Sequence, residues 1–65
     1  MTVTVNGDER EVQAADVAHL VTELGLLPAV TLVEHNGMAL RREEWTARPL
    51  SAGDRLEIIR IVAGG

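Results

Sequence analysis

The chain has 65 residues, 46% of them apolar, no cysteine, and a net charge of −4. This length supports one small domain, the charge argues against nucleic acid as a partner, and His19 and His35 are too few for a zinc site without cysteine. The apolar runs are short and no charged start with an apolar segment opens the chain, so we expect no membrane span, no secretory signal and a cytoplasmic protein.

An antiparallel hairpin is predicted at the start of the chain. Thr2 to Val5 alternates polar and apolar residues, which is typical of a half-buried strand. Asn6-Gly7 favours a tight turn because both residues tolerate a positive φ. A second strand is predicted from Glu9 to Gln13, with Val12 facing inward.

A helix is predicted from Ala15 to Gly25. Its apolar residues recur at the spacing of one helical face, at Val17, Leu20, Val21 and Leu24. Asp16 is placed to cap the first turn with its carboxylate. Gly25 can adopt the left-handed conformation that ends a helix, and Pro28 prevents its continuation.

The second half of the chain is predicted to be mostly strand. A third strand runs from Val30 to His35, and a second Asn-Gly pair at Asn36 turns the chain into a short strand from Met38 to Arg41. The polar segment around Trp45 favours a single helical turn. Ser51 to Asp54 is predicted to be a turn, and the last strand, from Arg55 to Val62, is the most β-branched.

The order of these elements predicts an α+β fold of the β-grasp, or ubiquitin-like, type. A mixed sheet of four to five strands would carry one main helix on one face. The last strand is apolar on both faces, so we place it centrally, parallel to the first strand. Residues 1–65 would form a single domain, with residues 63–65 as a flexible tail.

Gly64 and Gly65 end the chain directly after that strong strand. They could be only a frayed terminus. Without Cβ atoms, however, such an end can enter a narrow channel, and it presents a carboxylate that is anionic at neutral pH. That carboxylate must be activated before it reacts, and the chain has no phosphate-binding loop. If the terminus reacts, the chain is therefore a co-substrate and not an enzyme.

The whole chain resembles the ThiS branch of the ThiS/MoaD sulfur-carrier family. The similarity is carried by "NG", "DVAHLVTELGL", "HNGMALRREEW" and "LSAGDRLEIIRIVAGG". It is most specific at Asn36, the segment from Arg41 to Trp45, Gly53-Asp54 and the terminal Ala63-Gly64-Gly65. The MoaD branch tends to be longer and lacks the tryptophan segment. His35 departs from the family, whose members tend to have an apolar residue there, and leaves the local strand register open.

The resemblance implies a cycle at Gly65. An E1-like adenylating enzyme of the ThiF type would use ATP and Mg²⁺ to adenylate the carboxylate, while the carrier itself binds no cofactor. A persulfide donor would displace AMP and leave a thiocarboxylate. Thiazole synthase would then take the sulfur for the thiazole of thiamine. Alternatives are a carrier for a secondary metabolite, cysteine or molybdopterin, a ubiquitin-like protein modifier, or an interaction module with an idle tail. All six basic residues are arginine, so lysine-linked chains of the protein itself are excluded.

A partner-binding surface is predicted on the last strand. If Leu56 and Ile58 face the helix, Ile59 and Ile61 face the other way, where one helix cannot cover them. An exposed apolar surface beside the tail would serve for docking; loops covering the strand are the alternative. Arg60 lies on the Leu56 side near the rim, where it could reach a partner carboxylate or the adenylating enzyme.

The other conspicuous residues of the sequence are assigned structural roles. Trp45 is expected to close one end of the core, with a role as a partner anchor as the alternative. His19 is expected to be solvated. Asn6 and Asn36 are interpreted as turn residues, and Glu43-Glu44 as a solvated acidic face.

Overall fold

The structure, a computed structural model, describes residues 1–62. This part of the chain contains five strands, one α-helix and two short 3-10 helices. In chain order they are β1 (Thr2–Val5), β2 (Asp8–Glu11), α1 (Val17–Glu23), η1 (Pro28–Val30), β3 (Thr31–His35), β4 (Met38–Leu40), η2 (Arg42–Ala47) and β5 (Arg55–Arg60).

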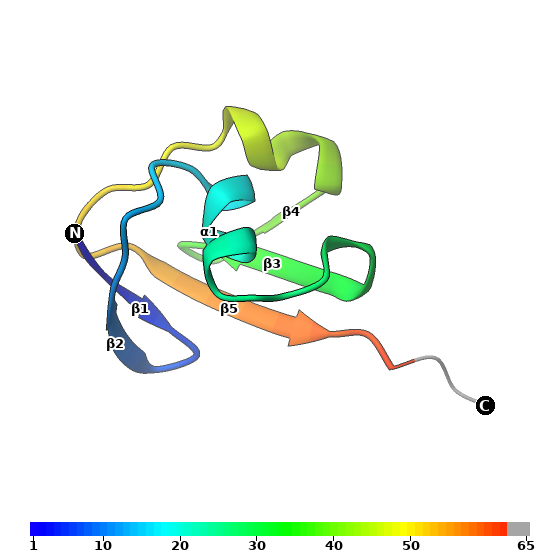
Figure 1. The fold of residues 1–65 in the computed structure, drawn as a ribbon, viewed down its shortest axis with the longest axis horizontal. Helices are drawn as coiled ribbons and strands as arrows, with labels where there is room; N and C mark the ends of the chain where they lie inside the picture. Colours follow the sequence, from blue (N-terminus) through cyan, green and yellow to red (C-terminus); the bar gives the residue numbers. More distant parts are fainter. Residues whose placement is uncertain (63–65) are drawn as a thin grey trace.

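The five strands form one mixed sheet in the order β2-β1-β5-β3-β4. The central strand β5 is parallel to β1 and antiparallel to β3, and each of these neighbours forms an antiparallel hairpin with an outer strand. The helix α1 lies across one face of the sheet (Figure 1). This arrangement confirms the predicted α+β, β-grasp fold and the parallel pairing of the first and last strands.

The last strand is shorter than predicted, since β5 ends at Arg60 and not at Val62. A strand extends only as far as a neighbour pairs with it. The ladder with β3 ends at the pair Thr31 and Arg60, because the residues just before β3 form η1, which begins at Pro28. One further hydrogen bond, from Ile61 N to Val30 O at 2.6 Å, follows the ladder.

Other element boundaries also differ from the prediction by a few residues, and β4 ends at Leu40 and not at Arg41. The second strand begins at Asp8 and ends at Glu11, although Val12 is buried as predicted. The main helix covers only Val17–Glu23. The third strand begins at Thr31, and the 3-10 segment η2 spans six residues, more than one turn.

The core lies between α1 and the inner face of the sheet. Val17, Leu20 and Val21 of the helix have no solvent exposure, and Leu24 is partly buried against them. Trp45, from η2, is only 2% exposed, which confirms its predicted place in the core. The other buried apolar residues are Val3, Val5, Val12, Ala14, Val33, Leu40, Leu50 and Leu56.

Both ends of α1 are fixed in the predicted manner. The carboxylate of Asp16 accepts a hydrogen bond from the His19 N–H at 2.8 Å, which caps the first turn. Gly25 has φ +73°, and across it Leu26 N donates to Val21 O. Glu23 accepts hydrogen bonds from the backbone of the segment that precedes the helix, at Gln13 and Ala14.

The two Asn-Gly turns do more than reverse the chain. Asn6 and Asn36 have φ of 50° and 49°, as the turn prediction requires. The Asn6 amide also hydrogen-bonds to both backbone groups of Ile58, at 2.7 and 3.0 Å. The Asn36 Oδ1 accepts from Arg55 N at 2.8 Å. Both side chains therefore attach the outer hairpins to the central strand.

His35 remains at an inward-facing position of β3, which settles its register. It pairs with Leu56 and is 6% exposed. Arg48 Nε donates to its Nδ1 at 2.9 Å, so Nε2 carries the proton and donates to Asp54 Oδ2 at 2.7 Å. Because both ring nitrogens have partners, a polar side chain is tolerated at this inward-facing position.

Asp54 joins this network to the start of β5. Burial raises the pKa of its carboxyl group, but hydrogen bonds from His35, the Ser51 N–H and Asn36 outweigh burial and hold the pKa below the ordinary value of 3.8. The carboxylate is therefore ionised at neutral pH and fixes the turn before β5.

Candidate functional site

The predicted reactive end, Ala63-Gly64-Gly65, lies outside the described residues. The structure instead describes its base. β5 ends at Arg60, and the next side chains, Ile61 and Val62, are 45% and 79% exposed. The chain therefore extends away from the folded domain from Ile61 onward, at the end of the central strand (Figure 1).

The face of β5 opposite the helix carries an exposed apolar patch. Leu56 is buried and Ile58 packs against the core, whereas Ile59 is 55% exposed. Ile59 pairs with Leu32 of β3, which is 51% exposed. These two residues and Ala39 of β4 surround a shallow hollow of about 110 Å³, and we call the three the outer sheet patch. The structure thus leaves Ile59 uncovered by loops; that a partner binds there stays a prediction.

Acidic side chains border the outer sheet patch. Glu34 and Glu57 are cross-strand neighbours and both are exposed. Two like charges in this position repel each other. A basic surface placed against them would relieve this repulsion. The contribution of Leu32 was missed from the sequence, although the alternation of Thr31, Val33 and His35 toward the core indicates it.

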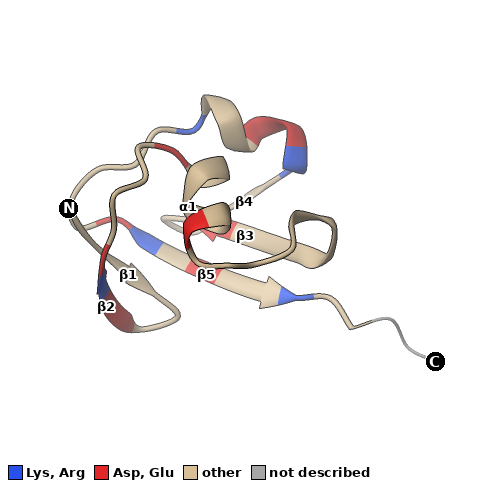
Figure 2. Cartoon of the chain, viewed as in Figure 1, with Lys and Arg blue, Asp and Glu red and all other residues tan. Residues whose placement is uncertain are grey.

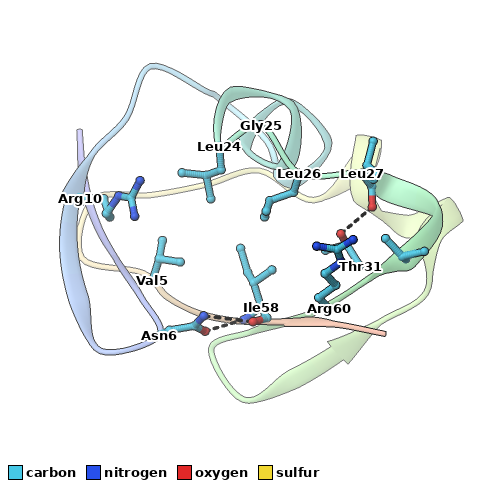
Figure 3. Close-up of a pocket in the computed structure, with 11 residues that line it drawn as sticks. Val5, Asn6, Arg10, Leu24, Gly25, Leu26, Leu27, Thr31, Ile58 and Arg60 are labelled. Atoms are coloured by element: carbon cyan, nitrogen blue, oxygen red, sulfur yellow. Dashed lines mark hydrogen bonds between the residues drawn. The ribbon is translucent and has the colours of Figure 1, made fainter. Parts of the chain in front are cut away.

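Arg60 lies on the helix side of the sheet, as predicted, beside a cavity of about 360 Å³. Figure 3 shows this cavity between the end of α1 and the strands below it, with Arg10 at one side and Arg60 at the other. Its apolar lining includes Val5, Leu24 and Ile58. The sequence did not indicate the cavity, because its walls come from distant segments.

Other chemistry is not evident in residues 1–62. No three side chains of the metal-binding types cluster within this part of the chain. His19 has a 75% exposed side chain, which confirms that it is solvated, and its Nδ1 lies 2.8 Å from the Asp16 carboxylate. Over the same residues, no helix has the length and apolar character needed to cross a bilayer.

Comparisons with known proteins agree with this architecture. The sequence model of the ThiS family matches residues 3–65. The crystal structure of a thiamine biosynthesis protein (ThiS) from Geobacter metallireducens is similar over 100% of both chains, with 35% identity and a TM-score of 0.83. The solution structure of a thiamine biosynthesis protein from that organism is 33% identical over 100% of this chain and 88% of its own, with a TM-score of 0.81. No curated protein sequence gives a significant match.

Proposed function

The chain belongs to the ThiS family, and from this membership we propose that it is the sulfur carrier for the thiazole of thiamine. One observation carries the proposal: the family match continues to Gly65, five residues after the fold's central strand ends. The domain then serves to present the carboxylate of Gly65, and other proteins supply the catalysis.

The first proposed step is activation of the Gly65 carboxylate. A carboxylate with a pKa of roughly 3.5 is ionised at neutral pH and resists nucleophilic attack. An E1-like enzyme of the ThiF type would join it to the α-phosphate of Mg-ATP, with release of pyrophosphate. The acyl-adenylate has AMP as a good leaving group, and the absence of a side chain on Gly65 keeps the acyl carbon open to attack.

The second proposed step brings in sulfur. The terminal sulfur of a protein persulfide attacks the acyl carbon and AMP leaves. A thiol then cleaves the sulfur–sulfur bond, so that the donor becomes a disulfide and Gly65 becomes a thiocarboxylate. A thiocarboxylate is an ionised, soft nucleophile at neutral pH, suited to attack on an intermediate held by thiazole synthase.

The body of the domain supports this cycle by recognition. We propose that the adenylating enzyme docks on the outer sheet patch, with Ile59 and the adjoining Ile61 in apolar contact. The border formed by Glu34 and Glu57 favours a basic surface on that enzyme. Arg60, which lies on the other face of β5, would be left for a second contact. Selection by the body keeps the reactive end away from unrelated enzymes.

Reconstitution tests the proposal. The protein is incubated with a ThiF-type enzyme, Mg-ATP and a persulfide donor, and its intact mass is measured. Exchange of one oxygen for sulfur supports the carrier function, and subsequent formation of thiazole with thiazole synthase supports the thiamine pathway. Loading without transfer to thiazole synthase would favour another sulfur pathway. Covalent attachment to other proteins would favour a modifier, and an unchanged mass would contradict the proposal.

A further inference from the structure

We propose that the cavity below the C-terminal end of α1 is a docking slot for an acidic, aliphatic segment of a partner protein. The segment would place one branched aliphatic side chain in the cavity and carboxylates against its two arginines. We call the cavity the helix-side slot and define it by Val5, Leu24, Leu26, Ile58, Arg10 and Arg60. The inference rests on the proposed function only in taking a tail-accepting enzyme as the source of that segment.

The floor of the helix-side slot is apolar and incompletely covered. Val5 is buried, whereas Leu24, Leu26 and Ile58 are only half-buried although they pack against the core. The volume, about 360 Å³, is at the lower end of the range of roughly 300–1,000 Å³ for ligand pockets. An aliphatic side chain inserted there would remove this surface from water, and that burial favours binding.

The charge of the helix-side slot is the reverse of that of the whole protein. The net charge is −4, yet two arginines and no acidic residue line the cavity. The other arginines are engaged or lie elsewhere: Arg48 binds His35 and Arg41 contacts Glu43 and Glu44. Among residues 1–62, neither Arg10 nor Arg60 forms a salt bridge.

The two guanidinium groups are placed to act together. Arg10 comes from β2 and pairs with buried Val3, which puts its side chain on the helix side of the sheet. Arg60 comes from the end of β5, and Figure 3 shows the two side chains at opposite sides of the apolar floor. A guanidinium group prefers a carboxylate and can bind both of its oxygens. The complementary ligand is therefore apolar in the middle and anionic at its ends.

The position of the helix-side slot links it to the tail. Arg60 is the last residue of β5, so any enzyme that takes up the chain after Val62 also lies close to this cavity. Along β5, a basic residue lies near each end and an acidic residue lies between them (Figure 2). The outer sheet patch has acidic neighbours on one face of the sheet, and two arginines line the helix-side slot on the other face. Two surfaces of opposite charge allow two partners of different charge to be distinguished.

A titration followed by NMR tests the inference with two probe peptides. The ¹⁵N-labelled full chain is titrated with acetyl-EELEE-amide and, separately, with acetyl-KKLKK-amide, at an ionic strength of about 0.1 M, where the Debye length is about 10 Å. We expect amide shifts at Leu26, Ile58 and Arg60 with the acidic peptide only. In the double variant Arg10→Gln/Arg60→Gln the affinity should fall by roughly three- to tenfold, since each exposed ion pair contributes little.

The control is Arg55→Gln, which removes one arginine charge from the same strand on the opposite face and is compared with the single variant Arg60→Gln. It should leave the affinity for the acidic peptide within about a factor of two. The inference is overturned by equal shifts with both peptides, by shifts centred on Leu32 and Ile59, or by no shifts with either peptide. An equal loss of affinity in the control variant would also overturn it.

Two further outcomes identify other occupants of the helix-side slot and also overturn the inference. Tighter peptide binding after removal of residues 63–65 would show that the chain's own C-terminal segment competes for the slot. Shifts at the same residues that depend on protein concentration without peptide would show a second copy of the chain there. Because the titration uses no sulfur chemistry, failure of sulfur loading and failure of peptide binding are separate results.

Discussion

The two ends of β5 differ in how firmly they are held. At its start, Arg55 exchanges hydrogen bonds with Asn36 through both backbone groups, and Asp54 binds His35 and the Ser51 N–H. Past its end, and within residues 1–62, one backbone hydrogen bond from Ile61 N to Val30 O connects the chain to the fold, and the side chains of Ile61 and Val62 are exposed. The central strand is therefore held firmly at its start and by few contacts at Ile61 and Val62, which follow its end.

The largest loss of stability is expected from Asp54→Ala, at the start of β5. The substitution leaves the buried Nε2 of His35 and the Ser51 N–H without their acceptor. We expect a loss of about 2–4 kcal/mol in the free energy of unfolding, measured with denaturant. The matched change after the strand, Val62→Ala, should cost less than about 0.5 kcal/mol because Val62 is 79% exposed. Equal losses of unfolding free energy at the two positions would show that the two ends of β5 are held equally firmly.

A smaller effect is expected from Asn6→Gly. Glycine keeps the positive φ of the turn but removes the two hydrogen bonds that join the Asn6 amide to Ile58. We expect a loss of about 1–2 kcal/mol in the free energy of unfolding. Asn6→Asp keeps the acceptor for the Ile58 N–H and loses the donor, so its stability should lie between that of the original protein and that of Asn6→Gly. If Asn6→Gly is as stable as the original, the side chain is only a turn former.

The pH dependence of stability tests the role of Asp54 at the start of β5. The folded protein holds the pKa of Asp54 below its ordinary value of 3.8, so the ionised group stabilises the fold. This contribution is complete above the ordinary value and is lost as the pH falls through the lower pKa of the folded state. Unfolding measured between about pH 5 and 2 should therefore show a shallower decline in Asp54→Asn than in the original. Glu57→Gln, an exposed carboxylate on the same strand, is the control; an unchanged slope in Asp54→Asn would refute the assignment.

A small effect on stability, but a marked one on recognition, is expected from Ile59→Asp. Ile59 is 55% exposed, so the free energy of unfolding should change by less than about 1 kcal/mol. Loss of the apolar side chain from the outer sheet patch should weaken binding to a ThiF-type enzyme by roughly tenfold or more, as measured by titration calorimetry. Glu11→Gln, at the outer strand β2, should bind normally. Unchanged binding of Ile59→Asp would remove the patch from the docking surface.

Much of the fold could be predicted because its signals are local. Alternation gives the strands, the spacing of Val17, Leu20 and Val21 gives the helix, and the Asn-Gly pairs give both turns. The end of β5 could not be predicted from its own β-branched residues, since its length is set by where β3 begins. The network of His35 with Arg48 and Asp54 joins residues 13 and 19 positions apart, and no local pattern indicates such a contact.

The candidate site divides in the same way. The exposure of Ile59 follows from alternation along one strand, but Leu32 and the helix-side slot depend on which strands become neighbours. The role of Gly65 rests on the sequence and on the family match, since the described residues end at Val62.

The most direct test compares the original protein with a variant that lacks Gly65, each incubated with a ThiF-type enzyme, Mg-ATP and a persulfide donor. The account predicts that the intact mass of the original shifts by one oxygen exchanged for sulfur, that the shortened chain stays unmodified, and that both unfold at the same denaturant concentration. Sulfur loading of the shortened chain, or its unfolding, would contradict the claim that a stable domain exists to present this one terminal glycine.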